Sequence, residues 1–275
     1  MRRLSLCVAL VVVLSASRAL AFDPVVFEDP TGDDKGNGSY KYPTSAEYKA
    51  GSFDIAKVEI KENGDKVDFT VTMKTQIEDP WKSKNWTPPG QGFSLQFIQV
   101  YVDTDHKAGS GHKKTLPGIN VLFDDASAWD KAILMSPQPV SRVKMEVQSK
   151  AKDLAKDVIV PSAVRVKGKS LTVSVAKADL GTPAAGWGYQ VISQSNEGYP
   201  DAEDVLTRDV NEVEGEHRFG GGSDWDCDPH AIDILAGQGR GKADEAQAQY
   251  DALKYTCAGS DLAKAKQAVV PMLYR

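Results

Sequence analysis

An alternation of apolar and polar side chains over residues 65–75 constrains the fold more than any other feature of the sequence. From position 67 to 74 the odd positions are apolar and the even positions polar: Val67, Phe69, Val71 and Met73 against Asp68, Thr70, Thr72 and Lys74. Successive side chains of a β-strand point to opposite faces, so this pattern predicts a strand with one buried and one solvated face.

Other short segments have the same character. Residues 93–103 are denser in apolar side chains, which is typical of a central strand covered on both faces or of a strand with a bulge. Gly168 predicts a hairpin turn between strands at 163–166 and 171–175, because glycine readily adopts the positive φ of such turns. Further strands are expected at 53–60, 119–123, 131–135, 143–147 and 187–193. Many short strands with turn-rich joints predict a mainly β, antiparallel fold, either a sandwich or a barrel.

Helices are expected near the C-terminal end. Residues 242–255 are rich in Ala, Gln and Glu, and Ala246, Tyr250 and Leu253 recur at helical spacing. Ser260 is suited to cap a second short helix, with Pro271 after it. Neither repeats nor a long linker divide residues 22–275, so one domain with a C-terminal helical extension is expected.

Residues 1–21 have the order of a cleavable secretion signal. Arg2 and Arg3 precede an apolar run over 4–14, and small residues lead to Ala21, after which cleavage is expected. A membrane anchor is the alternative, but spanning a bilayer takes roughly 20 apolar residues and this run has about half of that. The sequence therefore predicts export to the periplasm or the extracellular space, with no transmembrane segment in the mature protein.

Charge and motifs disfavour several classes of function. Cleavage removes Arg2, Arg3 and Arg18 and no acidic residue, which takes the net charge from −5 to −8. An acidic chain without a basic stripe is unsuited to nucleic acid and to anionic membranes. Its histidines lack metal-site spacing, and it has no nucleophile elbow and no distinct acid and base pair. An enzyme is therefore not expected.

Cys227 and Cys257 are the two cysteines that remain after cleavage. In an exported chain an even number of cysteines favours a disulfide. The alternatives are two free thiols or a metal site with too few partners. A bridge would tie the C-terminal helical segment to the preceding loop and add about 3 kcal/mol of stability.

Three glycine-rich loops concentrate carboxylates. The first spans residues 29–38 and contains Asp33 and Asp34, the second contains Asp103 and Asp105, and the third contains Asp224, Asp226 and Asp228. Calcium prefers six to eight hard oxygen ligands in a flexible cage, which such loops can supply. Asp and Gly are also ordinary turn residues, and none of the three loops has the spacing of an EF-hand. We expect calcium to stabilise at least one loop, through Asp33 or Asp34.

Trp81 and Trp86 lie in a polar, proline-bounded loop over residues 79–90. The apolar C–H faces of sugar rings stack on flat aromatic surfaces, so two loop tryptophans are a plausible carbohydrate platform. The alternative is a lid that buries them over one end of the fold, since tryptophan is usually well buried. Trp129 and Trp187 are expected in the core, and Trp225 fits either environment.

Several motifs, spread over nearly the whole mature chain, resemble a known family. They are Asp29-Pro30 with Gly32-Asp33-Asp34 and Gly36, Gly38, Tyr40 and Tyr42-Pro43-Thr44; Gly51 and Phe53-Asp54; Val100-Tyr101-Val102-Asp103-Thr104-Asp105; Pro117-Gly118-Ile119-Asn120; Gly186-Trp187-Gly188-Tyr189-Gln190-Val191; and Phe219-Gly220-Gly221-Gly222 with Ile232-Asp233-Ile234-Leu235. Together they resemble the DOMON-like domain at the C-terminal end of glucodextranase, which is related to family 9 carbohydrate-binding modules.

The resemblance implies a β-sandwich of the DOMON-like, immunoglobulin-like jelly-roll type. It further implies carbohydrate binding, in particular of α-glucans, and calcium near the acidic loops at Asp33, Asp34, Asp103 and Asp105. The expected function is that of a secreted, non-catalytic carbohydrate-binding protein. The alternative is an envelope or surface-layer protein that uses the sandwich to bind another protein.

Overall fold

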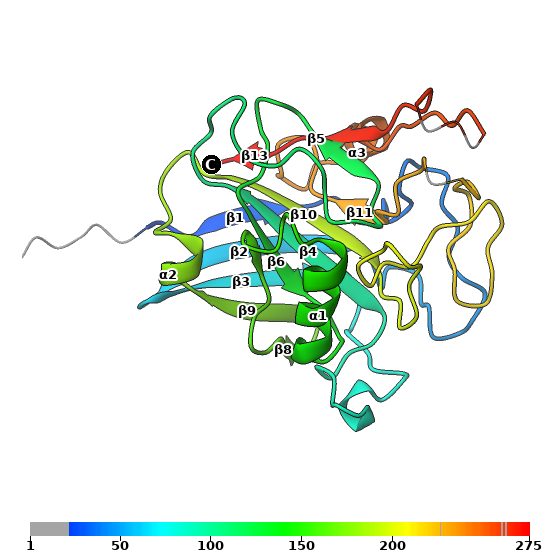
Figure 1. Ribbon diagram of the computed structural model, residues 1–275, viewed down its shortest axis with the longest axis horizontal. Coiled ribbons are helices and arrows are strands. Elements are labelled where there is room, and N and C mark those ends of the chain that lie inside the picture. Colours follow the sequence, from blue (N-terminus) through cyan, green and yellow to red (C-terminus); the bar gives the residue numbers. More distant parts are fainter. Residues whose placement is uncertain (1–21, 226, 260, 262) are drawn as a thin grey trace, which may run out of the picture.

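The computed structural model describes residues 22–225, 227–259, 261 and 263–275 (Figure 1). The expected signal segment at 1–21 lies outside the described residues, as does Ser260, the expected cap of a second C-terminal helix. Among the residues described, no helix has the length and apolar character that crossing a membrane requires.

The first sheet contains five antiparallel strands in the order β1-β2-β3-β9-β8. They are β1 (Val25–Glu28), β2 (Ile55–Asn63), β3 (Lys66–Met73), β8 (Arg165–Lys167) and β9 (Ser170–Ala176). The alternation predicted around β3 is confirmed, because Val67, Phe69, Val71 and Met73 are fully buried. The predicted hairpin is confirmed too, since Gly168 turns the chain from β8 to β9 with φ of 63°.

The second sheet contains six strands and is built around β4 and β10. They are β4 (Gln96–Asp103), β6 (Lys131–Met135), β7 (Val158–Ile159), β10 (Gly188–Ser195), β11 (Asp233–Ile234) and β13 (Leu273–Tyr274). Its pairs are antiparallel except β6 with β7. Every residue of β4 and of β10 is buried, which confirms the prediction of a central strand at 93–103.

The two sheets pack face to face around one apolar core. Phe69 and Val71 of β3 belong to the same buried cluster as Ile98, Val100 and Val191 from β4 and β10. The fold is therefore mainly β, a sandwich of antiparallel sheets with a few short helices, as expected. Within the described chain the strands do not close into a barrel.

A third layer covers the outer face of the second sheet, which explains why β4 is buried on both sides. Its elements are β5 (Val121–Phe123) paired in parallel with β12 (Ala268–Val270), and the helices α1 (Val140–Lys150) and α3 (Glu245–Ala252). Tyr101 of β4 packs against β5 and β12, and Phe97 packs against α1. The short helix α2 (Lys177–Leu180) follows β9, and the 3-10 helix η1 (Ser83–Asn85) lies in the loop before β4.

Two predicted elements differ from the structure. Residues 143–147 are part of helix α1 and not a strand, because Val143 and Val147, four residues apart, are both buried on one helical face. The helix expected at 242–255 is α3, but no second helix follows it among the described residues. There Ala268 and Val270 alternate into the outer layer as β12, and Pro271 follows the strand.

Candidate functional site

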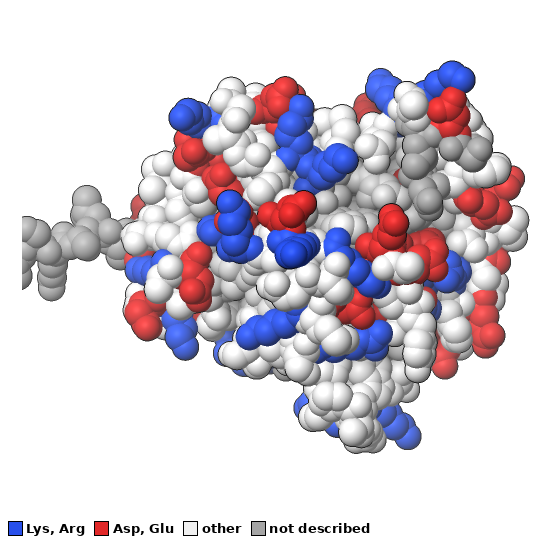
Figure 2. All heavy atoms as spheres, in the orientation of Figure 1, with Lys and Arg blue, Asp and Glu red and all other residues white. Residues whose placement is uncertain are grey.

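Trp81 and Trp86 lie in a loop that is braced by its own polar side chains. The carboxylate of Asp79 accepts hydrogen bonds from the N–H (2.8 Å) and hydroxyl (3.0 Å) of Ser83, whose hydroxyl oxygen accepts the N–H of Gly92 at 2.9 Å. The indole N–H of Trp86 donates to the carbonyl oxygen of Trp81 at 3.0 Å. The loop projects at the bottom of Figure 1, drawn in cyan, and the same projection in Figure 2 is mostly uncharged.

Both tryptophans line one cavity of about 480 Å³, between this loop, the start of α1 and the segment after β10. Each indole is half-buried. Neither of the two expectations, a lid that buries both tryptophans or a fully exposed platform, therefore describes them completely. Tyr199 projects at the rim and is 92% exposed. The lining residues are Trp81, Trp86, Thr87, Pro88, Gln138, Pro139, Arg142, Asn196, Glu197, Gly198, Tyr199, Arg208 and His217.

The indole of Trp81 is held by an aromatic cluster beneath it. Its ring meets those of Tyr48 and His217 edge-on, with centroids 6.1 and 5.9 Å away, and Tyr48 stacks on Phe53. The guanidinium of Arg208 lies 5.3 Å from the Trp81 ring centroid, within the range of a cation–π contact. Packing thus fixes the orientation of Trp81, whereas Tyr199 at the rim is almost fully exposed.

Polar groups converge at the inner end of the cavity. Arg208 forms an ion pair with Glu197 at 2.9 Å and donates to the hydroxyl of Tyr48 and the carbonyl of His217, both at 2.8 Å. Burial raises the pKa of Tyr48 to about 12, although Arg208 opposes the shift, so its hydroxyl stays neutral. Aromatic walls with a few fixed polar groups and a volume of this size are typical of small-ligand sites.

The structure separates the two aspartates of the first acidic loop. Asp34 accepts hydrogen bonds from the hydroxyl of Tyr42 and the N–H of Gly51, and it supports the loop. Asp33 instead meets Asp29 and Asp233, with one carboxylate oxygen from each lying within 4.8 Å of the others. Asp29 and Asp233 are not among the calcium ligands that the sequence predicts.

Burial and mutual repulsion disfavour ionisation of this cluster. Burial, followed by the charges of Asp33 and Asp54, raises the pKa of Asp29 well above its ordinary value. Asp233 is shifted in the same direction, by burial and then by Asp29 and Asp33. The pKa of Asp33 rises to about 7 and that of Asp54 to about 6, in both cases chiefly through burial.

Asp103 and Asp105 of the second loop meet Asp130, far from the first cluster in sequence. Their carboxylates are occupied: Asp103 accepts from the N–H of His106 (2.7 Å) and the hydroxyl of Tyr274 (2.6 Å), and Asp105 accepts from Lys107 and Ser110. Asp33 on the one hand, and Asp103 with Asp105 on the other, therefore belong to two separate carboxylate clusters, and Asp34 belongs to neither. This second cluster has the hydrogen bonding of an ordinary turn.

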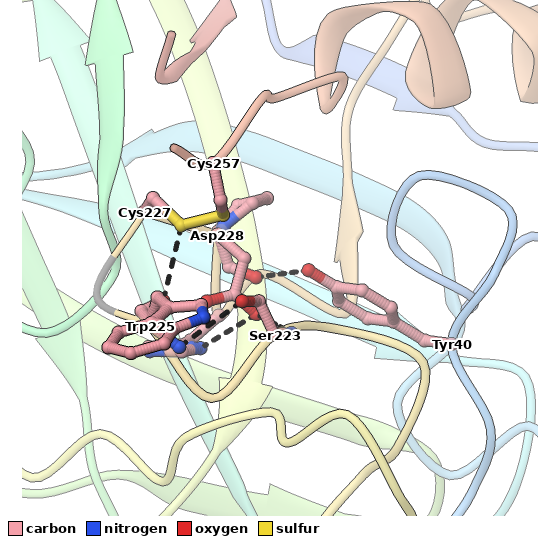
Figure 3. Close-up of a disulfide and its surroundings, with 8 residues drawn as sticks. Tyr40, Ser223, Trp225, Cys227, Asp228 and Cys257 are labelled. Carbon is pink, nitrogen blue, oxygen red and sulfur yellow. Dashed lines mark hydrogen bonds and ion pairs between the residues drawn. A yellow bond between two sulfur atoms is a disulfide. The ribbon is translucent and has the colours of Figure 1, made fainter. Parts of the chain in front are cut away.

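Cys227 and Cys257 form the predicted disulfide, with Cα atoms 5.5 Å apart (Figure 3). Trp225 lies beside the bridge, where its carbonyl oxygen is 3.4 Å from the sulfur of Cys227, and its side chain is 49% exposed. Trp129 and Trp187 are buried, as expected. Trp225 is not among the residues that line the cavity of Trp81 and Trp86.

Comparison with known proteins identifies the family. No curated protein sequence gives a match to the chain. A family model described as the C-terminal binding module, SLH-like, of glucodextranase matches residues 25–272, which include all the motifs that carried the resemblance. The chain belongs to this family of glucodextranase C-terminal binding modules.

Proposed function

We propose that the protein is an exported, non-catalytic carbohydrate-binding module that takes α-glucan chains into the cavity of Trp81 and Trp86. The observation that carries the proposal is the convergence of these two indoles and Tyr199 on one cavity of about 480 Å³. Flat rings at its wall and rim offer stacking surfaces to the C–H faces of sugars. The ion pair and amides at its inner end offer partners for hydroxyl groups.

The family supports a binding role, because its members are described as binding modules. The α-glucan preference is drawn from glucodextranase, the enzyme after which the family is named. Among the described residues that line the cavity, Glu197 is the one carboxylate, and it is paired with Arg208. Glycoside hydrolysis ordinarily needs two carboxyl groups across the scissile bond, so this cavity favours binding over turnover.

Affinity electrophoresis of the purified protein in gels with starch, dextran or pullulan tests the proposal. We expect retardation in at least one gel. The double variant Trp86→Ala, Tyr199→Ala should bind at least about tenfold more weakly, since two stacking surfaces are lost. Trp225→Ala is the matched control, an exposed tryptophan outside the cavity, and should bind like the unaltered protein.

Unchanged glycan binding by the double variant would show that the glycan does not bind in this cavity. Absence of retardation in every gel would contradict the α-glucan proposal. Export is tested by N-terminal sequencing of the secreted protein, which should begin at Phe22.

A protein partner in the cell envelope or surface layer is the second candidate. The SLH-like description of the family favours it. A pull-down that yields one stable protein partner, together with no glycan signal in the gels, would decide for this alternative.

A further inference from the structure

The cluster of Asp29, Asp33 and Asp233 is buried more deeply than carboxylates ordinarily are. The three residues are 5%, 2% and 0% exposed, and one oxygen from each lies within 4.8 Å of the others. Buried charges are normally paired or bound to a metal, because removing an ion from water is costly. Three carboxylates at this separation can all be ionised only if a positive partner lies between them.

Asp233 has hydrogen-bond donors around it, but other carboxylate oxygens of the cluster do not. Asp233 accepts from the N–H of Ile55 at 2.6 Å and of Ile234 at 3.0 Å. Neither oxygen of Asp29 accepts a hydrogen bond of ordinary geometry, although the N–H of Ala236 faces it, and Oδ1 of Asp33 has no partner either. Buried polar atoms in proteins are almost always satisfied, so these oxygens are suited to bind a ligand.

The nearest basic side chain does not neutralise the cluster. Lys74 donates to Oδ2 of Asp54 at 3.1 Å and leaves Oδ1 of Asp54 buried without a partner. Asp54 is itself close enough to raise the pKa of Asp29, Asp33 and Asp233. Lys74 is thus paired with Asp54 and offsets the negative charge at Asp33 only in part, so the four carboxylates outnumber this one basic side chain.

Rigid elements fix the positions of the three carboxylates. Asp29 directly follows β1, and Asp233 opens β11. The loop that carries Asp33 is tied to α3 by Gln249, whose amide donates to the carbonyl of Asp33 at 2.5 Å and whose carbonyl oxygen accepts the N–H of Ile234 at 2.9 Å. Such preorganisation is expected of a site built for an ion.

We propose that Asp29, Asp33 and Asp233 bind one calcium ion, which links the first acidic loop to β11 at the far end of the sequence. The donors are hard oxygens, which Ca²⁺ prefers, whereas zinc sites generally contain His or Cys. Mg²⁺ retains several of its waters in most proteins, and a cluster this buried favours the more readily dehydrated Ca²⁺. Asp34 and the cluster of Asp103, Asp105 and Asp130 are not ligands of this ion.

Calorimetric titration and thermal unfolding of the chelator-treated protein test the proposal. We expect one calcium per chain and a melting temperature that rises by roughly 5–10 °C when calcium exceeds its Kd about 100-fold. A protein that gives no calcium heat and the same melting temperature with and without millimolar calcium would overturn the proposal. Equal stabilisation by Mg²⁺ at the same concentration would overturn the choice of calcium.

Substitution separates a metal ligand from a merely structural carboxylate. Asp29→Asn should lower calcium affinity at least 100-fold, and in chelator it should melt no lower than the unaltered protein, because it removes one of the repelling charges. Asp105→Asn, in the second cluster, is the matched control and should keep both the affinity and the melting shift. Loss of the calcium response in Asp105→Asn and its retention in Asp29→Asn would contradict the assignment of the ligands. If a variant fails to fold, the titration of the unaltered protein still tests whether calcium binds.

Discussion

At the scale of single residues, the ion pair of Arg208 with Glu197 illustrates how burial decides the contribution of a charge. Its side chains are only 9% and 12% exposed, and Arg208 also contacts the ring of Trp81. Glu197→Gln would leave the guanidinium buried without its counter-charge. We expect this variant to lose about 3 kcal/mol of unfolding free energy, at the lower end for broken buried pairs because water reaches the cavity.

A second ion pair provides the control for this prediction. Lys49 and Glu78 are 2.6 Å apart, but their side chains are 59% and 36% exposed. Glu78→Gln should change the unfolding free energy by less than about 1 kcal/mol, as is usual for surface pairs. Urea unfolding of both variants measures the difference, and equal losses would show that burial is not the deciding factor.

The residues of the two candidate sites differ in how far they could be predicted. Trp81 and Trp86 are five positions apart in a loop without apolar surroundings, so the sequence alone predicts that they lie close together. Asp29 and Asp233 are brought together only by the folded topology. The available signal was local: Asp233 is a charged residue inside the apolar run Ile232 to Leu235, and such a residue is almost never buried without a partner.

At the scale of elements, the side chain of Asp157 joins three segments of the chain. It precedes β7 and accepts from Lys131 of β6 at 2.9 Å, and it lies 2.8 Å from the ring nitrogen Nε2 of His112 in a preceding loop. Burial alone would raise the pKa of Asp157, but the hydrogen bonds of His112 and Lys131 outweigh it and hold the pKa below its ordinary value of 3.8. The exposed Lys156 lies 4.0 Å away.

A group whose pKa is lower in the folded state stabilises the fold at pH values above its unfolded pKa. This stabilisation is lost as the pH falls through the folded pKa. Asp157→Asn should therefore melt roughly 1–3 °C below the unaltered protein at neutral pH. The gap should close as the pH is lowered below about 4. Thermal melts over this range check the prediction, and a gap that widens on acidification would contradict it.

Elements were predictable where one period of the sequence dominates. In β3 the apolar positions alternate over the whole strand, and the predicted hairpin between β8 and β9 needed only Gly168. Helix α1 was missed because its two buried valines, at 143 and 147, fit a short alternating strand as well as one turn of helix. The helix packs in the outer layer over β4, where both valines contact the cluster around Phe97. That layer also contains β12 from the distant C-terminal part of the chain, which a local pattern does not reveal.

At the scale of the whole molecule, the disulfide between Cys227 and Cys257 closes the part of the chain that contains both β11 and α3. The cysteines are 30 positions apart, and cross-linking them restricts the unfolded chain by about 3–4 kcal/mol. For a protein of this size that loss corresponds to a fall of roughly 6–15 °C in the melting temperature. Melting with and without a reductant measures it, and identical curves for verified oxidised and reduced protein would contradict the prediction.

The same experiment tests whether the cavity depends on the disulfide. Trp81, Trp86 and the other residues that line the cavity lie outside the segment closed by the disulfide. Reduction at a temperature well below the lower melting point should therefore leave glycan binding unchanged. The double variant Cys227→Ser, Cys257→Ser should melt like the reduced protein, and its melting temperature should not change when the reductant is added. Weaker glycan binding by folded, reduced protein would instead show that the bridge supports the cavity across the sheet, because packed elements can transmit a local loosening.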